Sequence, residues 1–146
     1  VGKIEVTKEG TDVTLVTYGS TWRLVMEAAQ ELEKIGISAE VIDIQSLIPF
    51  DLSHEISESV KKTNRLVVID EDVEGGATAF ILQQILEKQK AFRYLDSDPL
   101  TISAENHRAP YASDGDYFSK PSVDDMVEKI YGLFTESNPE KFPKIY

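Results

Sequence analysis

Short runs of apolar, β-favouring residues alternate along the chain with longer segments in which apolar residues recur every three or four positions. Four of the short runs indicate strands, because they are rich in Val, Ile and Leu and are bounded by polar or turn residues. They occupy residues 13–18, 39–44, 65–70 and 100–104. Strands that alternate with helices in this way are typical of a parallel sheet with helices on both faces.

The helical period appears in four segments, and turn and capping residues mark where they begin and end. Gly36 is expected to stop the first helix, whereas Asp51 and Ser122 are expected to cap the second and the last. The apolar stripes are Trp22, Val25, Met26, Ala29, Leu32; Leu52, Ile56, Val60; Ala77, Ile81, Leu82, Ile85, Leu86; and Val123, Met126, Val127, Ile130 with Leu133 or Phe134.

The remaining segments fit one domain over residues 1–146. Residues 3–6 predict a short additional strand, whereas 45–50 and 105–120 are expected to be loops. Residues 136–146 contain two prolines and no period, so we expect an extended tail there. The chain begins without an initiator Met or a signal peptide, and it is therefore expected to be a fragment of a longer polypeptide.

The net charge limits the classes of macromolecule that the chain could bind. A formal charge of −11 and a pI near 4.6 argue against nucleic acid and anionic membranes, because both are bound by clustered Lys and Arg. A basic protein partner is compatible with this charge, although solubility alone also explains it. The absence of cysteine excludes disulfides and a Cys nucleophile and fits a cytoplasmic protein. No apolar run approaches the roughly 20 residues of a membrane span.

Residues at the carboxyl ends of the predicted strands are the first candidates for chemistry, because ligands of open parallel sheets bind there. Gly19-Ser20 before a helix could hold a phosphate, but the three-glycine fingerprint is missing and the neighbouring strand ends in Asp70-Glu71-Asp72. Those carboxylates could hold a cation, yet consecutive strand residues alternate faces, so a solvated strand end is the favoured interpretation.

Two histidines remain as candidates. His54 is expected to be exposed on the second helix. His107 and Arg108 follow the last predicted strand, where they either make hydrogen bonds within a loop or contact the active site of another domain. Aromatic residues from Tyr111 to Phe118 indicate a surface that packs either on this domain or on a neighbouring one.

Several motifs in fixed order resemble one family. Residues 8–19, 36–51 and 59–68 resemble successive segments of the carboxy-terminal domain in beta subunits of 2-oxo acid dehydrogenase decarboxylase components. Gly75-Gly76 and the sequence Phe92-Arg93-Tyr94-Leu95-Asp96 follow where that family has them. The resemblance extends from about residue 2 to residue 131, and it covers pyruvate and branched-chain members, including those with fused alpha and beta portions.

The resemblance implies a transketolase C-terminal-like fold: a three-layer α/β/α sandwich whose mostly parallel five-stranded sheet has one antiparallel edge strand at residues 3–6. It also implies an assembly domain that is inactive alone. Thiamine diphosphate and Mg²⁺ are bound in this family by other domains, so the resemblance implies no catalytic, cofactor-binding or metal-binding residue here.

Partner contacts are the role that the resemblance does imply. The domain is expected to pair subunits into an oligomer and to bind the small basic domain of the dihydrolipoyl acyltransferase component through Asp96. His107, Arg108 and Tyr111 are expected to contact the neighbouring active-site domain, although Arg108-Ala109-Pro110-Tyr111 departs from the usual Pro-x-Pro-Tyr.

The sequence leaves open both the substrate and two other identities for the domain. The substrate could be any of several 2-oxo acids, and the resemblance to fused members favours branched-chain ones. The chain could instead be the equivalent domain of a transketolase or a deoxyxylulose phosphate synthase, although acidic strand ends do not suit a sugar phosphate. A third alternative is a stand-alone acidic interaction module.

Overall fold

A computed structural model describes residues 3–45, 50–51, 53–73, 77–106, 118–119 and 122–143, with the backbone alone for 71–73, 104–106 and 118–119. At its centre is a sheet with the strand order β1-β3-β2-β4-β5-β6. Strands β3, β2, β4 and β5 are parallel to one another, whereas β1 and β6 are antiparallel to their neighbours. The strands are β1 (Ile4–Lys8), β2 (Val13–Thr17), β3 (Ala39–Ile44), β4 (Leu66–Val73), β5 (Leu100–Asn106) and β6 (Phe118–Ser119).

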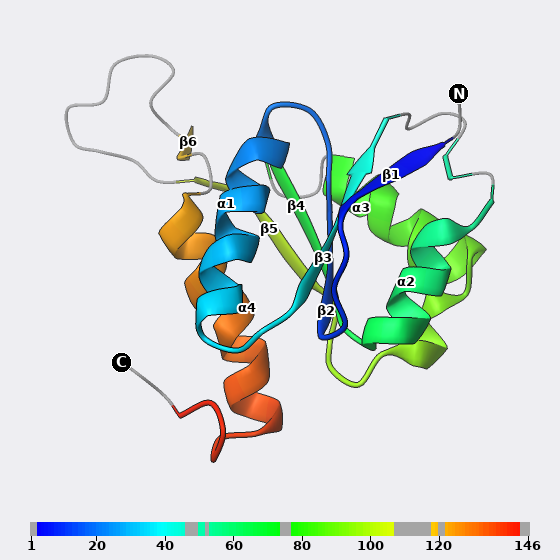
Figure 1. The fold of residues 1–146 in the computed structure, drawn as a ribbon. Coiled ribbons are helices and arrows are strands. Elements are labelled where there is room, and N and C mark those ends of the chain that lie inside the picture. Colours follow the sequence, from blue (N-terminus) through cyan, green and yellow to red (C-terminus); the bar gives the residue numbers. More distant parts are fainter. Residues whose placement is uncertain are drawn as a thin grey trace.

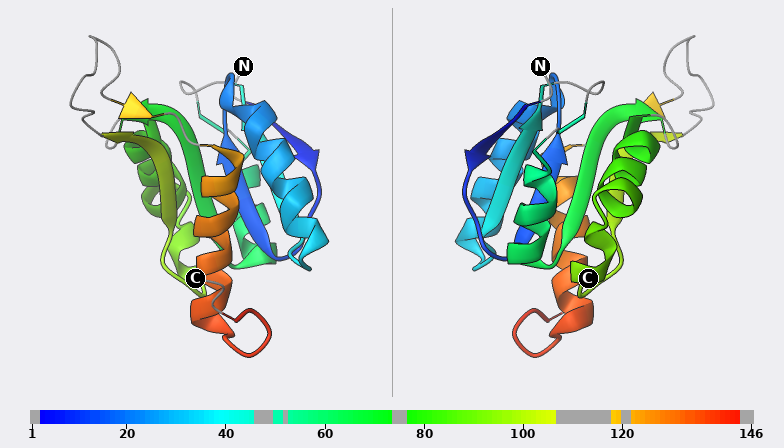
Figure 2. Two further views of the ribbon diagram at one scale, coloured as in Figure 1. Left: turned by 90° about the vertical axis from the view of Figure 1, so that its left-hand side faces the viewer. Right: turned by 90° about the vertical axis from the view of Figure 1, so that its right-hand side faces the viewer.

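Helices cover both faces of this sheet and complete three layers (Figure 1; Figure 2). On one face α1 (Thr21–Lys34) lies beside α4 (Val123–Ser137). The other face carries α2 (Glu55–Thr63) and α3 (Ala77–Gln83), which continues as a π-helical turn over Gln84–Lys88. A short 3₁₀ helix, η2 (Ala91–Tyr94), follows it.

Side-chain alternation along the central strands produces two separate cores. Val13 and Leu15 of β2 pack toward α1 and α4, whereas Val16 packs toward α2 and α3, and all three are fully buried. A strand that is buried on both faces needs apolar residues at successive positions. This is why the central strands appear in the sequence as continuous apolar runs.

Asp51 caps α2 from a buried position before the helix. Its carboxylate accepts the backbone N–H of Glu55 at 3.0 Å and of Ile56 at 2.8 Å. It also accepts Nε2 of Gln89 at 3.0 Å, and Oε1 of Gln89 in turn accepts the N–H of Ser57 at 3.1 Å. Four backbone N–H groups at a helix start lack partners within the helix, and here side chains satisfy three of them. Asp51 therefore satisfies the first turn of α2 as expected, but the N-cap position itself is occupied by His54, and the helix begins at Glu55 and not directly after Asp51.

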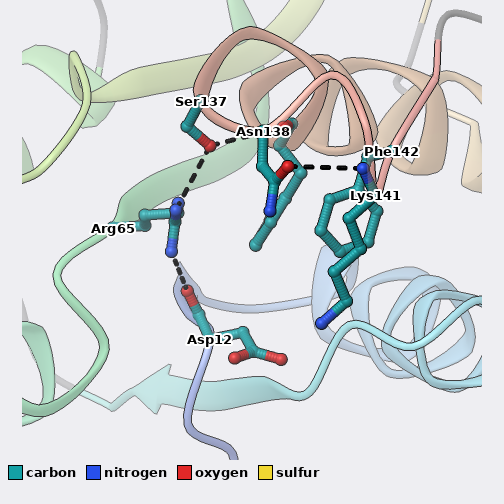
Figure 3. A pocket seen from close by; sticks show the side chains of 7 residues that line it. Asp12, Arg65, Ser137, Asn138, Lys141 and Phe142 are labelled. Atoms are coloured by element: carbon teal, nitrogen blue, oxygen red, sulfur yellow. Dashed lines mark hydrogen bonds between the residues drawn. The ribbon is translucent and has the colours of Figure 1, made fainter.

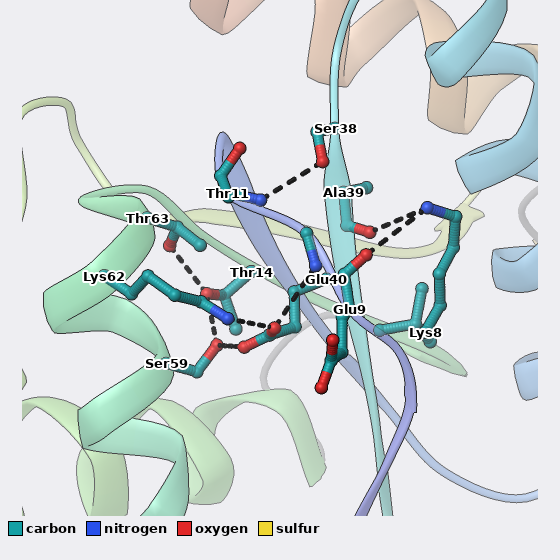
Figure 4. A network of polar contacts seen from close by, with 12 residues as sticks. Lys8, Glu9, Thr11, Thr14, Ser38, Ala39, Glu40, Ser59, Lys62 and Thr63 are labelled. Atoms are coloured by element: carbon teal, nitrogen blue, oxygen red, sulfur yellow. Dashed lines mark hydrogen bonds and ion pairs between the residues drawn. The ribbon is translucent and has the colours of Figure 1, made fainter.

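Glu40 of β3 brings a buried charge to the interface between the sheet and α2 (Figure 4). Its side chain is 4% exposed, and it accepts Nζ of Lys62 at 2.5 Å and Oγ of Ser59 at 2.5 Å. Ser59 donates its single proton there, so it must accept from the hydroxyl of Thr14 at 2.8 Å, which is 2.7 Å from that of Thr63. The carboxylate is therefore stabilised by a line of hydroxyl groups as well as by an ion pair.

Gly10 makes the turn between β1 and β2 fit against β3. Its N–H donates to Oε1 of Glu40 at 3.2 Å. A Cβ at this position would lie 2.3 Å from the carbonyl carbon of Ala39 and 2.5 Å from the nitrogen of Glu40. Because both are backbone atoms, only a residue without a side chain allows this approach.

The expected fold is confirmed: a mostly parallel sheet of five strands has an antiparallel edge strand, β1, and helices on both faces. Two details differ. Strand β6 adds two residues to the sheet inside a segment expected to be loop. Helix α4 runs to Ser137, two residues into the expected tail, and Phe142 beyond it is buried against Tyr131 and Phe134. Aromatic packing thus orders a segment in which the sequence shows no period.

Candidate functional site

Asp96 lies at the edge of the sheet where the parallel strands begin, on the segment that leads from η2 to β5. Its side chain is exposed. Its backbone N–H donates to the carbonyl oxygen of Asn64 at 2.8 Å, and Nδ2 of Asn64 donates to the carbonyl oxygen of Tyr94 at 2.7 Å. These two bonds attach the segment to the carboxy-terminal end of α2, so Asp96 is presented from a fixed backbone.

Phe92 is the most exposed large apolar side chain in the described part of the chain, at 64%. It belongs to η2, whose neighbouring Ala91 is fully buried. Arg93 lies over the ring of Tyr94, with its guanidinium carbon 5.0 Å from the ring centre, and Nζ of Lys61 lies 5.9 Å from the same ring. The ring of Phe92, the cations Lys61 and Arg93 and the carboxylate of Asp96 therefore occur together on the surface formed by η2, the end of α2 and the segment before β5.

Arg65 borders a cavity of about 180 Å³ at the same edge of the sheet (Figure 3). Its guanidinium donates to the carbonyl oxygen of Asp12 and to Oγ of Ser137, each at 3.3 Å, and stacks 4.4 Å from the centre of the Phe134 ring. Ser137 is the last residue of α4, and a cation is stabilised at a helix carboxy terminus. We therefore interpret Arg65 as a structural link between β4, the turn before β2 and the end of α4.

The opposite edge of the sheet, where the parallel strands end, contains polar groups but no assembled catalytic set among the described residues. The hydroxyl of Tyr18 donates to Oδ2 of the buried Asp70 at 3.0 Å. The side chain of Ser20 does not cap α1, and it borders an open depression of about 410 Å³ together with Gly19 and Arg23. Within the described ranges, no group of three His, Asp or Glu side chains could hold a metal ion.

Asp43 near the end of β3 has an altered acidity. Partial burial raises the pKa of its carboxyl above the ordinary value of 3.8, and the like charge of Glu5 raises it further. Glu5 stands directly opposite Asp43 in the antiparallel pair formed by β1 and β3. Both effects disfavour the ionised form.

Of the partner contacts expected from the sequence, the structure describes Asp96 alone. Asp96 is exposed at the edge where the strands begin, as a partner contact requires. His107, Arg108 and Tyr111 lie outside the described residues, so their expected contact with an active-site domain stays a prediction. His54 is exposed, but it precedes α2 in a left-handed conformation with φ 54° and does not lie within the helix. Sequence reasoning gave no functional role to Phe92, because the four residues of η2 are too few to show which side of the segment faces solvent.

Comparison with known proteins places the chain in a family. The sequence profile of the transketolase C-terminal domain matches residues 2–125. A pyruvate dehydrogenase E1 component subunit beta-2 from Oryza sativa subsp. japonica is 39% identical over 128 residues, which are 87% of this chain and 33% of that protein. The corresponding beta subunit from Rhizobium meliloti is 37% identical over 131 residues, 89% of this chain and 28% of that protein. The chain thus spans about a third of the length of these relatives.

Solved structures agree on the fold. A split-gene transketolase, determined as an inactive beta4 tetramer, superposes with a TM-score of 0.68 at 27% identity, over 92% of this chain and 43% of that one. A 2-oxoglutarate:ferredoxin oxidoreductase from Magnetococcus marinus superposes with a TM-score of 0.56 at 18% identity, over 90% of this chain and 19% of that one, and it supports the fold alone. The chain therefore belongs to the transketolase C-terminal domain family.

Proposed function

We propose that this chain is the carboxy-terminal assembly domain of the decarboxylase component of a 2-oxo acid dehydrogenase complex. The complete enzyme would decarboxylate a 2-oxo acid oxidatively and transfer the acyl group to a lipoyl group. Support comes from the beta subunits of pyruvate dehydrogenase, which are 37–39% identical over nearly all of the chain. The same names make pyruvate the first substrate to test, ahead of the branched-chain acids favoured by the sequence.

Within that enzyme the domain would pair subunits and bind the small basic domain of the acyltransferase component through Asp96. The observation that supports this role is the exposed carboxylate of Asp96 on a backbone fixed by two hydrogen bonds to Asn64. A preorganised carboxylate loses little freedom when it pairs with an Arg or a Lys. The net charge of −11 would also attract a basic domain.

Thiamine diphosphate and Mg²⁺ would be held by the other domains of the enzyme. A diphosphate with its metal ion needs oxygen ligands that converge on the cation. The described side chains offer no such group, and the buried carboxylate of Asp70, which accepts from Tyr18, does not suit a diphosphate. The residues at hand therefore do not fit the cofactor, and no chemical step is assigned to them.

Replacing Asp96 by Lys tests the docking role. In the assembled enzyme, Asp96→Lys should weaken binding of the acyltransferase component by at least about tenfold, because an attraction becomes a repulsion. Isothermal titration calorimetry measures this affinity. Glu27→Lys is the matched control: it changes the net charge equally at an exposed position of α1, in the other helical layer. Unchanged affinity in the Asp96 variant, with the fold intact, would end the docking proposal.

A second function is supported by the similarity to a split-gene transketolase. Such an enzyme would act on sugar phosphates. The assay that separates the two uses the full-length parent enzyme with thiamine diphosphate, Mg²⁺ and an artificial electron acceptor. We expect turnover of pyruvate or a branched-chain 2-oxo acid and none by the 146-residue chain alone. Ketol transfer between sugar phosphates, without any 2-oxo acid activity, would instead establish the transketolase alternative.

A further inference from the structure

The ring of Phe92 is exposed although the segment that carries it is well packed. Ala91 before it is fully buried, and Tyr94 and Leu95 after it pack on the core formed with Ile81 and Ile85. A loosely held segment would expose several apolar side chains together. Here Ala91 is buried, Tyr94 and Leu95 are half-buried, and the ring of Phe92 is the one large apolar side chain of the segment that projects into solvent.

Backbone conformation holds this arrangement in place. Lys90, which precedes η2, has a φ of 59°, and Asn64, which binds the segment from α2, has a φ of 63°. Residues other than glycine adopt such left-handed conformations uncommonly, although Asn at the end of a helix is among those that do, and hydrogen bonds help to hold them. The bonds that join Asn64 to Tyr94 and to Asp96 do so here. Phe92 and Asp96 are thus carried by one rigid segment, four residues apart.

Charge changes sign along this segment. Lys88, Lys90 and Arg93 precede or adjoin Phe92 and are exposed, whereas Asp96 and Asp98 follow it and are exposed as well. No acidic residue interrupts residues 88–94 in a chain whose net charge is −11. A uniformly basic partner would be repelled by the first half of the segment. A partner that fits the whole segment needs an anion on one side and a cation on the other.

We propose that Phe92 is the apolar anchor of the docking surface for the acyltransferase component. Its ring inserts into an apolar socket of the partner's small domain, which presents a cation toward Asp96 and an anion toward Arg93. This inference rests on the proposed function and extends it, because docking through Asp96 alone requires only a basic partner. A rigid aromatic ring flanked by Arg is the kind of group that contributes most to binding at protein interfaces.

An apolar anchor and a charge contact have different kinetic effects. Loss of the anchor accelerates dissociation, and this effect does not depend on ionic strength. Loss of a charge mainly slows association and reduces its dependence on salt. The two contributions can therefore be measured separately in the same complex.

The experiment uses the full-length enzyme and the immobilised small domain of its acyltransferase component, with both rate constants measured by surface plasmon resonance at low and high salt. Phe92→Ala should accelerate dissociation about tenfold or more at both salt concentrations, and Phe92→Leu should restore most of the lifetime of the complex. Arg93→Glu should slow association. The matched control is Ile35→Ala, which truncates a side chain that is 44% exposed after α1 and should leave both rates unchanged.

The outcomes test the anchor role of Phe92 and the docking role of Asp96 separately. Asp96→Asn, measured beside these variants, should slow association and reduce its dependence on salt. Faster dissociation for Phe92→Ala together with this change for Asp96→Asn supports both the anchor and the docking role. An effect of Asp96→Asn without one of Phe92→Ala overturns the anchor and leaves the docking role standing. An effect of Phe92→Ala alone supports the anchor and overturns the part of Asp96. If neither variant changes binding, both proposals fail. A change in the oligomeric state of Phe92→Ala with unchanged docking would show that the ring contacts a second copy of the enzyme, and this also overturns the anchor.

Discussion

A single methyl group at Gly10 should be enough to destabilise the domain strongly. The added Cβ would lie 2.3–2.5 Å from backbone atoms of Ala39 and Glu40, and a backbone cannot rotate away as a side chain can. Relieving the contact requires the turn between β1 and β2 to move off β3, and this movement breaks the hydrogen bond from Gly10 to Glu40.

The expected loss of stability is the sum of the cost of the steric overlap and the cost of the broken hydrogen bond. Overpacking in a close-packed interior costs about 1–3 kcal/mol. A lost hydrogen bond to a charged, buried group costs about 1.5–3 kcal/mol. Together they predict a decrease of about 2.5–6 kcal/mol in the free energy of unfolding, a large part of the roughly 5–15 kcal/mol that stabilises an ordinary domain. For a domain of this size the melting temperature should fall by about 5–24 °C.

Urea denaturation of Gly10→Ala, followed by circular dichroism, measures this loss. Gly132→Ala is the matched control, because an added Cβ there meets nothing within 4 Å and the residue lies inside α4. Alanine should raise the stability at Gly132 by up to about 1 kcal/mol through helix propensity. If Gly10→Ala were tolerated with a loss below about 1 kcal/mol, the close approach of the turn to β3 would be refuted.

Two further perturbations test buried and partly buried carboxylates. Asp51→Ala removes the cap of α2 and leaves Nε2 of Gln89 without its acceptor, so the free energy of unfolding should fall by about 2–4 kcal/mol, measured by the same urea denaturation. An unchanged midpoint would contradict the capping role. Asp43→Asn should stabilise the domain at neutral pH, because the ionised carboxyl has a raised pKa and is therefore less favourable in the folded state. This gain should disappear as the pH falls below 3.8, where Asp43 is protonated in both states, and a gain that persisted there would exclude ionisation as its cause.

Much of the fold could be predicted because burial on two faces leaves a clear pattern. The central strands and the helices α1 and α4 follow from apolar periods, and Asp51 was recognisable as a cap because it follows Pro49-Phe50 directly before a helical stripe. Strand β6 and helix η2 were missed, since two and four residues are too short to show a period.

The candidate site was less accessible to sequence reasoning. The motif containing Asp96 was found through the resemblance, but its exposure depends on bonds from Asn64, which is 32 positions away. The exposure of Phe92 could not be predicted from the sequence either, because its neighbours Ala91 and Leu95 pack inward while its own ring does not. Contacts between distant residues decide which side of a short segment faces solvent, and no local pattern records them.

The hydroxyl line beneath Glu40 also limits how α2 can sit on the sheet. Apolar side chains such as Val, Leu and Ile can replace one another, so a helix that packs through them alone could slide along the sheet at little cost. Glu40 finds Ser59 and Lys62 together at one position of α2 only. Sliding by a single residue would leave the buried carboxylate with the N–H of Gly10 but without its hydroxyl and ammonium partners on α2, at a cost of several kcal/mol. We infer that this network selects one alignment of helix and sheet among near-equivalent ones, and that it thereby fixes the place of Asn64 and of the docking surface that Asn64 holds.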